Sequence, residues 1–94
     1  MLSKLPINLE KIDEKDMDRE ILRAGIIAEL DAINLYEQMA AMANDKNIKA
    51  ILLDIAKEEK THIGEFQAML LNRDKQQVEE LEEGKKEVKE EVGE

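Results

Sequence analysis

The sequence has no cysteine and no tryptophan, and in 94 residues it contains one proline, one tyrosine and one phenylalanine. The absence of cysteine excludes disulfides and thiolate metal sites. Because strand-forming residues are scarce while Ala, Leu, Ile, Met, Glu and Lys dominate, the composition predicts an all-α protein. A chain of this length forms one small domain and buries a limited part of its surface.

Excess positive charge and long apolar runs are also missing. The chain has 14 basic and 23 acidic residues, a formal net charge of -9. This balance argues against nucleic-acid or anionic-membrane partners and favours cations as ligands. No stretch approaches the length of a membrane span, and the first residues do not resemble a secretion signal. We therefore expect no membrane association and a cytoplasmic location.

We divide the chain into three parts. Residues 1–15 contain the only proline, Pro6, and apolar residues without helical period, so we expect an extended N-terminal arm that packs on its own or a neighbouring subunit. Residues 16–72 are expected to form an antiparallel two-helix hairpin. Residues 73–94 are expected to form a shorter C-terminal helix or tail, opened by Asp74 and weakened by Gly84. Its apolar stripe is Val78, Leu81, Val88 and Val92.

The first long helix is expected to begin near Asp16, a suitable N-cap. Its inner stripe alternates steps of four and three residues, as in a helical bundle. The members of that stripe are Leu22, Ile26, Glu29, Ile33, Tyr36 and Ala40. Apolar residues also flank it, namely Ile27, Leu30, Leu35, Met39 and Met42. A hairpin alone would leave this surface in water, so we expect the chain to self-associate.

A polar turn at residues 44–47 separates the two long helices, with Asp45 as the N-cap of the second helix. This helix is expected to end near Leu71 and Asn72. Its predicted inner stripe is Ile48, Leu52, Ile55, Glu59, His62, Phe66 and Met69. Glu29 and Glu59 each lie fifteen residues from position 44, so both are about 22 Å from the turn at 1.5 Å per residue. The hairpin therefore brings Glu29 to the level of Glu59 and His62.

The Glu-x-x-His spacing of Glu59 and His62 is by itself a weak signal in a chain this acidic. Its placement strengthens it, because Glu29, Glu59 and His62 occupy positions where an aliphatic residue is expected. Burying unpaired carboxylates costs several kcal/mol, and no Lys or Arg lies on either stripe. A bound metal cation is the simplest compensation.

Each residue also has a structural interpretation. His62 could be a core histidine that is hydrogen-bonded to a backbone carbonyl or to Glu59. Glu29 could accept a hydrogen bond from Tyr36, and Tyr36 could be ordinary core. Asp31 lies off the stripe, where a solvated surface position is the simpler interpretation. The methionines are most simply core.

One hairpin supplies two carboxylates and one imidazole, which is too few for two metal ions. Two hairpins related by a twofold axis supply four Glu and two His, the ligand set of carboxylate-bridged di-iron bundles. Four carboxylates also balance the charge of two Fe(II). Oxygen and nitrogen ligands suit iron or manganese better than a structural zinc site. We therefore predict that the chain dimerises into a four-helix bundle with two metal ions per dimer.

The runs at residues 28–37 and 58–62 resemble those of the ferritin-like superfamily, and within it the encapsulated ferritins, which are two-helix ferritins associated with encapsulin shells. The resemblance implies dimers assembled into a ring, commonly a homodecamer, with a ferroxidase centre at the dimer interface. It also implies that Glu29, Glu59 and His62 are iron ligands and that Tyr36 is a site tyrosine.

The chain departs from this family's pattern at two positions. Leu35 stands where some relatives carry Trp, and of the two positions flanking Glu29 where they carry acids this chain has Ala28 and Asp31, which leaves Asp31 as the remaining candidate for an auxiliary metal site. No shell-targeting peptide is recognisable before Glu94. In some relatives the domain is fused ahead of the shell protein, so the chain could be one part of a longer product.

Two functions from different classes remain open. The first is a ferroxidase that oxidises Fe(II) to Fe(III) with O2 at catalytic residues Glu29, Tyr36, Glu59 and His62, for iron storage in an encapsulin nanocompartment. The resemblance implies that the shell protein is a partner. The alternative is a non-catalytic helical assembly module with a structural metal site. Rubrerythrins share the carboxylate bundle, but the lack of cysteine excludes their rubredoxin centre here.

Overall fold

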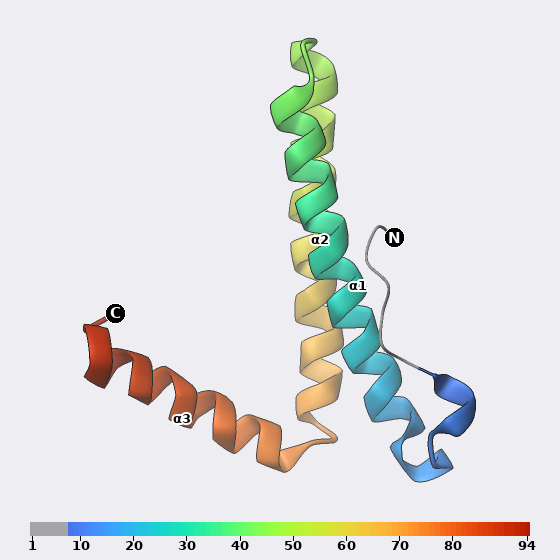
Figure 1. Ribbon diagram of the computed structural model, residues 1–94, viewed down its shortest axis with the longest axis vertical. Helices are drawn as coiled ribbons and strands as arrows, with labels where there is room; N and C mark the ends of the chain where they lie inside the picture. Colours follow the sequence, from blue (N-terminus) through green and yellow to red (C-terminus); the bar gives the residue numbers. More distant parts are fainter. Residues whose placement is uncertain (1–7) are drawn as a thin grey trace.

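The computed structural model describes residues 8–94 and is all-α in this range. A single 3-10 turn, η1 (Leu9–Lys11), precedes three α-helices. The helices are α1 (Glu14–Met42), α2 (Lys46–Leu71) and α3 (Lys75–Val92). In Figure 1, α1 and α2 run antiparallel side by side, and α3 leaves the base of α2 and extends away from the hairpin. The expected fold class, a hairpin followed by a shorter helix, is therefore confirmed for a single chain.

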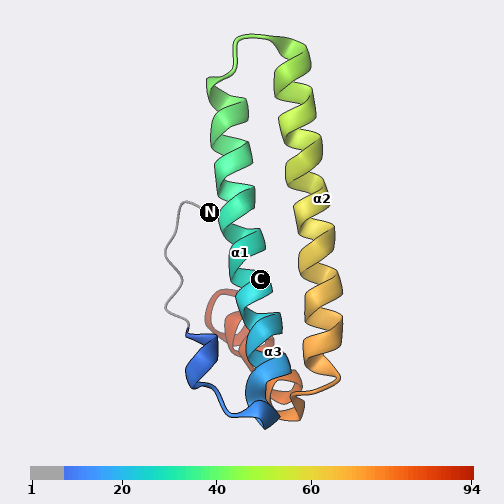
Figure 2. The same cartoon turned by 90° about the vertical axis from the view of Figure 1, so that its right-hand side faces the viewer.

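The helix boundaries follow local capping signals. The Asp45 carboxylate accepts hydrogen bonds from the backbone N–H groups of Asn47 and Ile48, at 2.8 and 3.0 Å, as its predicted N-cap role requires. At the far end, α2 stops at Leu71, as expected. Only three residues, 43–45, connect α1 to α2, so the two helices must be close neighbours along the chain and in space (Figure 2).

The start of α1 differs from the prediction. It begins at Glu14, and its N-cap residue, Asp13, makes no side-chain capping hydrogen bond. Asp16 lies inside the first turn, where its carboxylate pairs with Arg19 at 2.6 Å. Part of the predicted extended arm is η1, in which the Asn8 side chain accepts a hydrogen bond from Glu10 N. The rest of that arm, residues 1–7, lies outside the described residues.

The predicted inner stripe of α1 is confirmed. Leu22, Ile33 and Ala40 are buried, and the polar members Glu29 and Tyr36 are partly buried. The flanking residues are mostly exposed, as expected for a hairpin without a partner, and they include Ile27, Leu30, Met39 and Met42.

The predicted inner stripe of α2 is correct in its middle, where its members are partly buried, and wrong at its two ends. Ile48 and Met69 are exposed, while Ala56 and Leu70 are the buried residues of this helix. The stripe that packs on α1 therefore runs through Leu52, Ala56, Glu59, Ile63, Phe66 and Leu70. A two-helix hairpin buries only a narrow stripe of each helix, so the second apolar edge of α2, which includes His62, stays partly in solvent.

The molecule is extended. Its radius of gyration is 16.5 Å, whereas a compact domain of this length has about 12 Å. Helix α3 has no buried residue and touches the rest of the described chain only weakly. None of the described helices is both long and apolar enough to cross a bilayer.

Candidate metal centre

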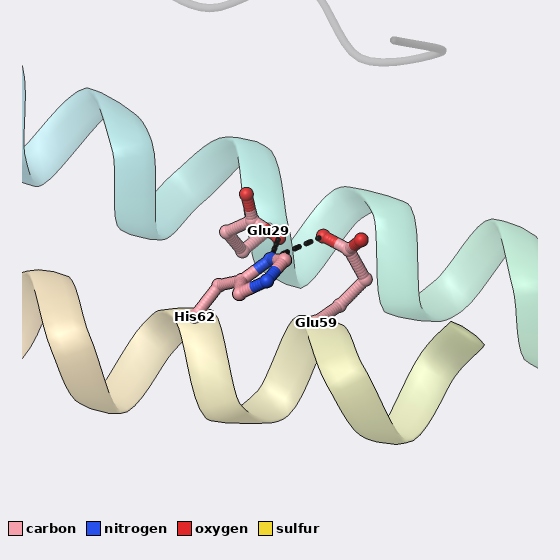
Figure 3. A group of neighbouring side chains, drawn as sticks. All are labelled: Glu29, Glu59 and His62. Atoms are coloured by element: carbon pink, nitrogen blue, oxygen red, sulfur yellow. Dashed lines mark ion pairs between the residues drawn. The ribbon is translucent and has the colours of Figure 1, made fainter. Parts of the chain in front are cut away.

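Three polar side chains meet between the two long helices. Glu29 projects from α1, and Glu59 and His62 project from successive turns of α2 toward it (Figure 3). One ligand atom from each residue lies within 4.8 Å of the other two. The antiparallel hairpin produces this meeting, because residues at equal distances from a short connection lie at the same level. The predicted convergence of these three residues is therefore present in a single chain.

The histidine ring faces both carboxylates with the same nitrogen. His62 Nδ1 lies 3.4 Å from Glu29 Oε2 and 3.6 Å from Glu59 Oε2. These separations are long for hydrogen bonds, and one ring nitrogen carries at most one proton, so it cannot serve both oxygens. Two carboxylates and an imidazole nitrogen aimed at one point form a donor set suited to a divalent cation.

The three side chains differ in exposure. Those of Glu29 and Glu59 are 19% and 18% exposed, whereas that of His62 is 45% exposed. Glu29 Oε2 is a buried atom without a hydrogen-bond partner among the described residues. A buried carboxylate oxygen left without a partner is costly, so the site favours a ligand that supplies positive charge. These features fit a metal ion better than a closed hydrogen-bonded core.

An open hollow of about 410 Å³ lies beside the three residues. Its lining is Glu29, His62, Glu65, Phe66 and Met69. Sequence reasoning did not single out Glu65, although it follows His62 by three residues and so lies one turn further along the same side of α2. The hollow is open to the outside, and His62, the most exposed of the three residues, forms part of its lining.

Two further predicted site residues lie outside the group of three. Tyr36 is partly buried seven residues after Glu29, about 10 Å along the helix. Among the described residues no hydrogen bond joins Tyr36 to Glu29 Oε2, so this alternative explanation for the buried carboxylate is wrong for that oxygen. Asp31 is partly buried on α1 and does not belong to the group of potential ligands. A role for Tyr36 or Asp31 stays a prediction.

Residues 5–91 match the family described as EncFtn-like. The chain belongs to the EncFtn-like family. The match extends over nearly the whole sequence, so it includes the hairpin, α3 and the three converging residues. The resemblance to encapsulated ferritins that the sequence indicated is thereby confirmed.

One EncFtn-like relative is the ferritin-like-encapsulin shell fusion protein of Pyrococcus furiosus, which is 59% identical over 95 residues. The alignment covers 99% of this chain and 28% of that protein, so the chain spans little more than a quarter of the relative's length. The crystal structure of the encapsulated ferritin domain from Pyrococcus furiosus superimposes with a TM-score of 0.85 at 58% identity, covering 99% of this chain and 97% of that one. The EncFtn-like fold is thus shared along the full domain.

Proposed function

We propose that this EncFtn-like chain is a ferroxidase that oxidises Fe(II) with O2 at a di-iron site shared between two copies. The observation that carries the proposal is the convergence of Glu29, Glu59 and His62 around one point, with Glu29 Oε2 buried and lacking a hydrogen-bond partner among the described residues. Family membership supports iron as the substrate metal.

A shared site follows from the number and exposure of the ligands. One chain offers three ligand groups, and the imidazole side chain is 45% exposed at the edge of the hairpin. A second hairpin packed against this edge by a twofold axis would add another Glu29, Glu59 and His62. The resulting four carboxylates and two imidazoles match the di-iron carboxylate bundles and balance two Fe(II) ions.

The apolar surface beside the site supports the same arrangement. Met69 is 49% exposed next to His62, and Leu30 is 52% exposed on α1. A soluble monomer rarely leaves so much of a hairpin's apolar surface uncovered, and burial of this surface would stabilise a dimer. The radius of gyration, larger than that of a compact domain, is also typical of a chain that completes its core with a partner.

Each side chain has a defined part in the proposed reaction. Two Fe(II) substrate ions would each give up one electron, and these two electrons with two protons from solvent would reduce O2 to hydrogen peroxide. The Glu29 and Glu59 carboxylates would hold the ions and balance the rise in charge on oxidation, while His62 would add a nitrogen ligand. Tyr36 lies two turns from Glu29 on the same stripe, and we assign it a supporting role in the site. Asp31 would hold an auxiliary ion.

The cellular setting of the proposal is an encapsulin nanocompartment in the cytoplasm. A relative in which this domain is joined to an encapsulin shell supports a shell partner. Dimers would assemble into a ring, and the family resemblance suggests a homodecamer. Since an open ring has no sealed cavity, iron storage would occur inside the surrounding shell.

The test compares two neighbouring carboxylates. Glu59 belongs to the converging group, whereas Glu58 is exposed on α2 outside it. Anaerobic titration with Fe(II) should saturate at about one ion per chain, and admission of O2 should then give a rapid near-ultraviolet absorbance rise. Glu59→Ala should abolish both signals, and Glu58→Ala should keep them.

Two results would contradict the proposal. One is identical iron binding and oxidation by wild type and Glu59→Ala. The other is tight iron binding by a species whose native mass is that of a monomer, because this would remove the shared site.

The competing function is a non-catalytic assembly module with a structural metal. The observation in its favour is that only five apolar residues in the described chain are buried, so the hairpin needs a partner whether or not it is an enzyme. Under this alternative, metal would raise the native mass from monomer to dimer, and O2 would cause no absorbance rise.

A further inference from the structure

Gly25 on α1 lies against the ring of Phe66 on α2. A Cβ atom placed on Gly25 would lie 3.1 Å from Phe66 Cδ2, 3.1 Å from Cε2 and 3.2 Å from Cζ. Such distances are tighter than ordinary carbon contacts, so a side chain at position 25 would force the ring or the helix to move. The missing side chain of Gly25 is therefore what lets the Phe66 ring approach α1 so closely.

This contact lies one helical turn from the metal centre. Gly25 precedes Glu29 by one turn of α1, and Phe66 follows His62 by one turn of α2. Phe66 also lines the hollow that contains Glu29 and His62. Gly25 and Phe66 therefore meet between the two helices one turn away from the ligands.

The other glycines inside the described helices provide a contrast. Gly64 on α2 and Gly84 on α3 have no atom within 4 Å of an added Cβ. Glycine weakens a helix interior in every case, but only Gly25 combines that cost with a close neighbour. Steric need therefore explains Gly25 and does not explain Gly64 or Gly84.

We propose that Gly25 is a positioning residue for the metal centre, because its missing side chain seats Phe66 against α1 and so sets the distance between Glu29 on α1 and the Glu59–His62 pair on α2. The inference rests on the proposed function, since it concerns the geometry of that same site. Metal ligands must be placed within about 0.2 Å, so a shift of a few tenths of an ångström between the helices would weaken binding.

The experiment uses the whole 94-residue chain in whatever oligomeric state it adopts in solution. Gly25→Ala should bind Fe(II), or Co(II) as a spectroscopic probe, about tenfold more weakly than wild type, the size of effect typical for groups that orient metal ligands. The visible spectrum of bound Co(II) should change because the ligand geometry changes. Gly64→Ala is the matched control and should keep wild-type affinity and spectrum.

A second variant tests the contact directly. Adding Phe66→Leu to Gly25→Ala removes the ring carbons that meet the new methyl group, so the pair should recover affinity and the wild-type Co(II) spectrum. The inference is overturned if Gly25→Ala and Gly64→Ala bind metal equally. It is also overturned if the double variant binds no better than Gly25→Ala, since the effect would then not pass through Phe66.

The Glu59→Ala variant separates the two proposals. If wild type binds metal and Glu59→Ala does not, the metal site stands, and an unaffected Gly25→Ala removes the positioning role alone. If wild type and Glu59→Ala bind equally, the proposed site fails and the positioning role fails with it. Urea unfolding of the single and double variants without metal measures whether positions 25 and 66 are coupled in stability. If they are coupled but Gly25→Ala binds metal as tightly as wild type, the contact has only a structural role.

Discussion

The α1–α2 hairpin and helix α3 differ in what they bury, although both are helical and an aspartate side chain caps both α2 and α3. All five buried apolar residues of the described chain belong to the hairpin, which also encloses Glu29 and Glu59. Helix α3 buries nothing and exposes its whole apolar stripe, Val78, Leu81, Val88 and Val92. Capping and an amphipathic pattern favour a helix locally, but most of its stability comes from packing, and only the packed hairpin holds polar groups of two helices beside each other.

A polar contact at the start of α3 joins the two regions. Arg23 of α1 donates to the Asp74 carboxylate at 2.9 Å, and the same carboxylate caps α3 by accepting from Gln77 N at 3.0 Å. Asp74 therefore fixes the first turn of α3 to α1, and nothing in the described chain covers the rest of that helix.

The largest expected difference between the regions is in core stability. Leu70→Ala in α2 should lower the free energy of unfolding by about 2–4 kcal/mol, because Leu70 is 5% exposed and its removal leaves a cavity. Val88→Ala in α3 should cost less than about 1 kcal/mol, since Val88 is 47% exposed. Urea unfolding followed by circular dichroism measures both. Equal costs would mean that α3 is packed as tightly as the hairpin in solution.

A smaller effect is expected from the caps. Asp45→Ala removes an acceptor for two backbone N–H groups and should lower the stability of the cooperative hairpin by about 1 kcal/mol. Asp74→Ala should instead melt the first turn of α3 with little change in the unfolding midpoint of the hairpin. Amide hydrogen exchange, read residue by residue, distinguishes the two cases. Loss of protection throughout α1 in Asp74→Ala would show that the regions unfold as one unit.

The smallest expected effect is a pH dependence confined to α3. The hydrogen bond from Gln77 N and the neighbouring Arg23 guanidinium lower the pKa of Asp74 below its usual value of 3.8. Because the folded-state pKa is depressed, the carboxylate stabilises α3 fully above pH 3.8, and this contribution is lost as the pH falls through the lower folded-state pKa. Carbon chemical shifts at residues 75–80 should therefore report fraying only below about pH 4.

The matched control for this titration is Asp74→Ser, which keeps a capping oxygen but carries no charge. Its α3 shifts should be nearly flat over the same pH range. A wild-type curve that follows the Ser variant would show that the Asp74 charge contributes nothing to the junction.

The sequence predicted the hairpin and the convergence of Glu29, Glu59 and His62 because both depend on spacing about one short turn. Equal distances from position 44 translate directly into equal height along two antiparallel helices. The inner stripe of α1 was predicted for the same reason, since its period is regular and its members are large.

The two ends of the α2 stripe were placed wrongly, because two neighbouring apolar edges have the same period. One passes through Ala56 and Leu70, the other through Ile48 and Met69, and periodicity does not reveal which edge faces α1 when a partner could cover the second. The start of α1 was missed because Asp13 and Asp16 are equally good caps in sequence. Gly25 is unusual in the sequence because it is a glycine inside a strong helical pattern. Its role became clear only from the position of the Phe66 ring.

The three-residue connection after Met42 has a consequence for how the hairpin can vary. Each added or deleted residue on one arm alone rotates every later side chain of that arm by about 100° and shifts it by 1.5 Å. Insertion or deletion of a single residue between Glu29 and Glu59 would turn His62 away from the Glu29 carboxylate. Adding or removing seven residues in α1 and in α2 together would keep these side chains aligned. The positions of the ligands along both helices are thus counted from the turn, and insertions and deletions should be tolerated mainly outside the interval from Glu29 to His62.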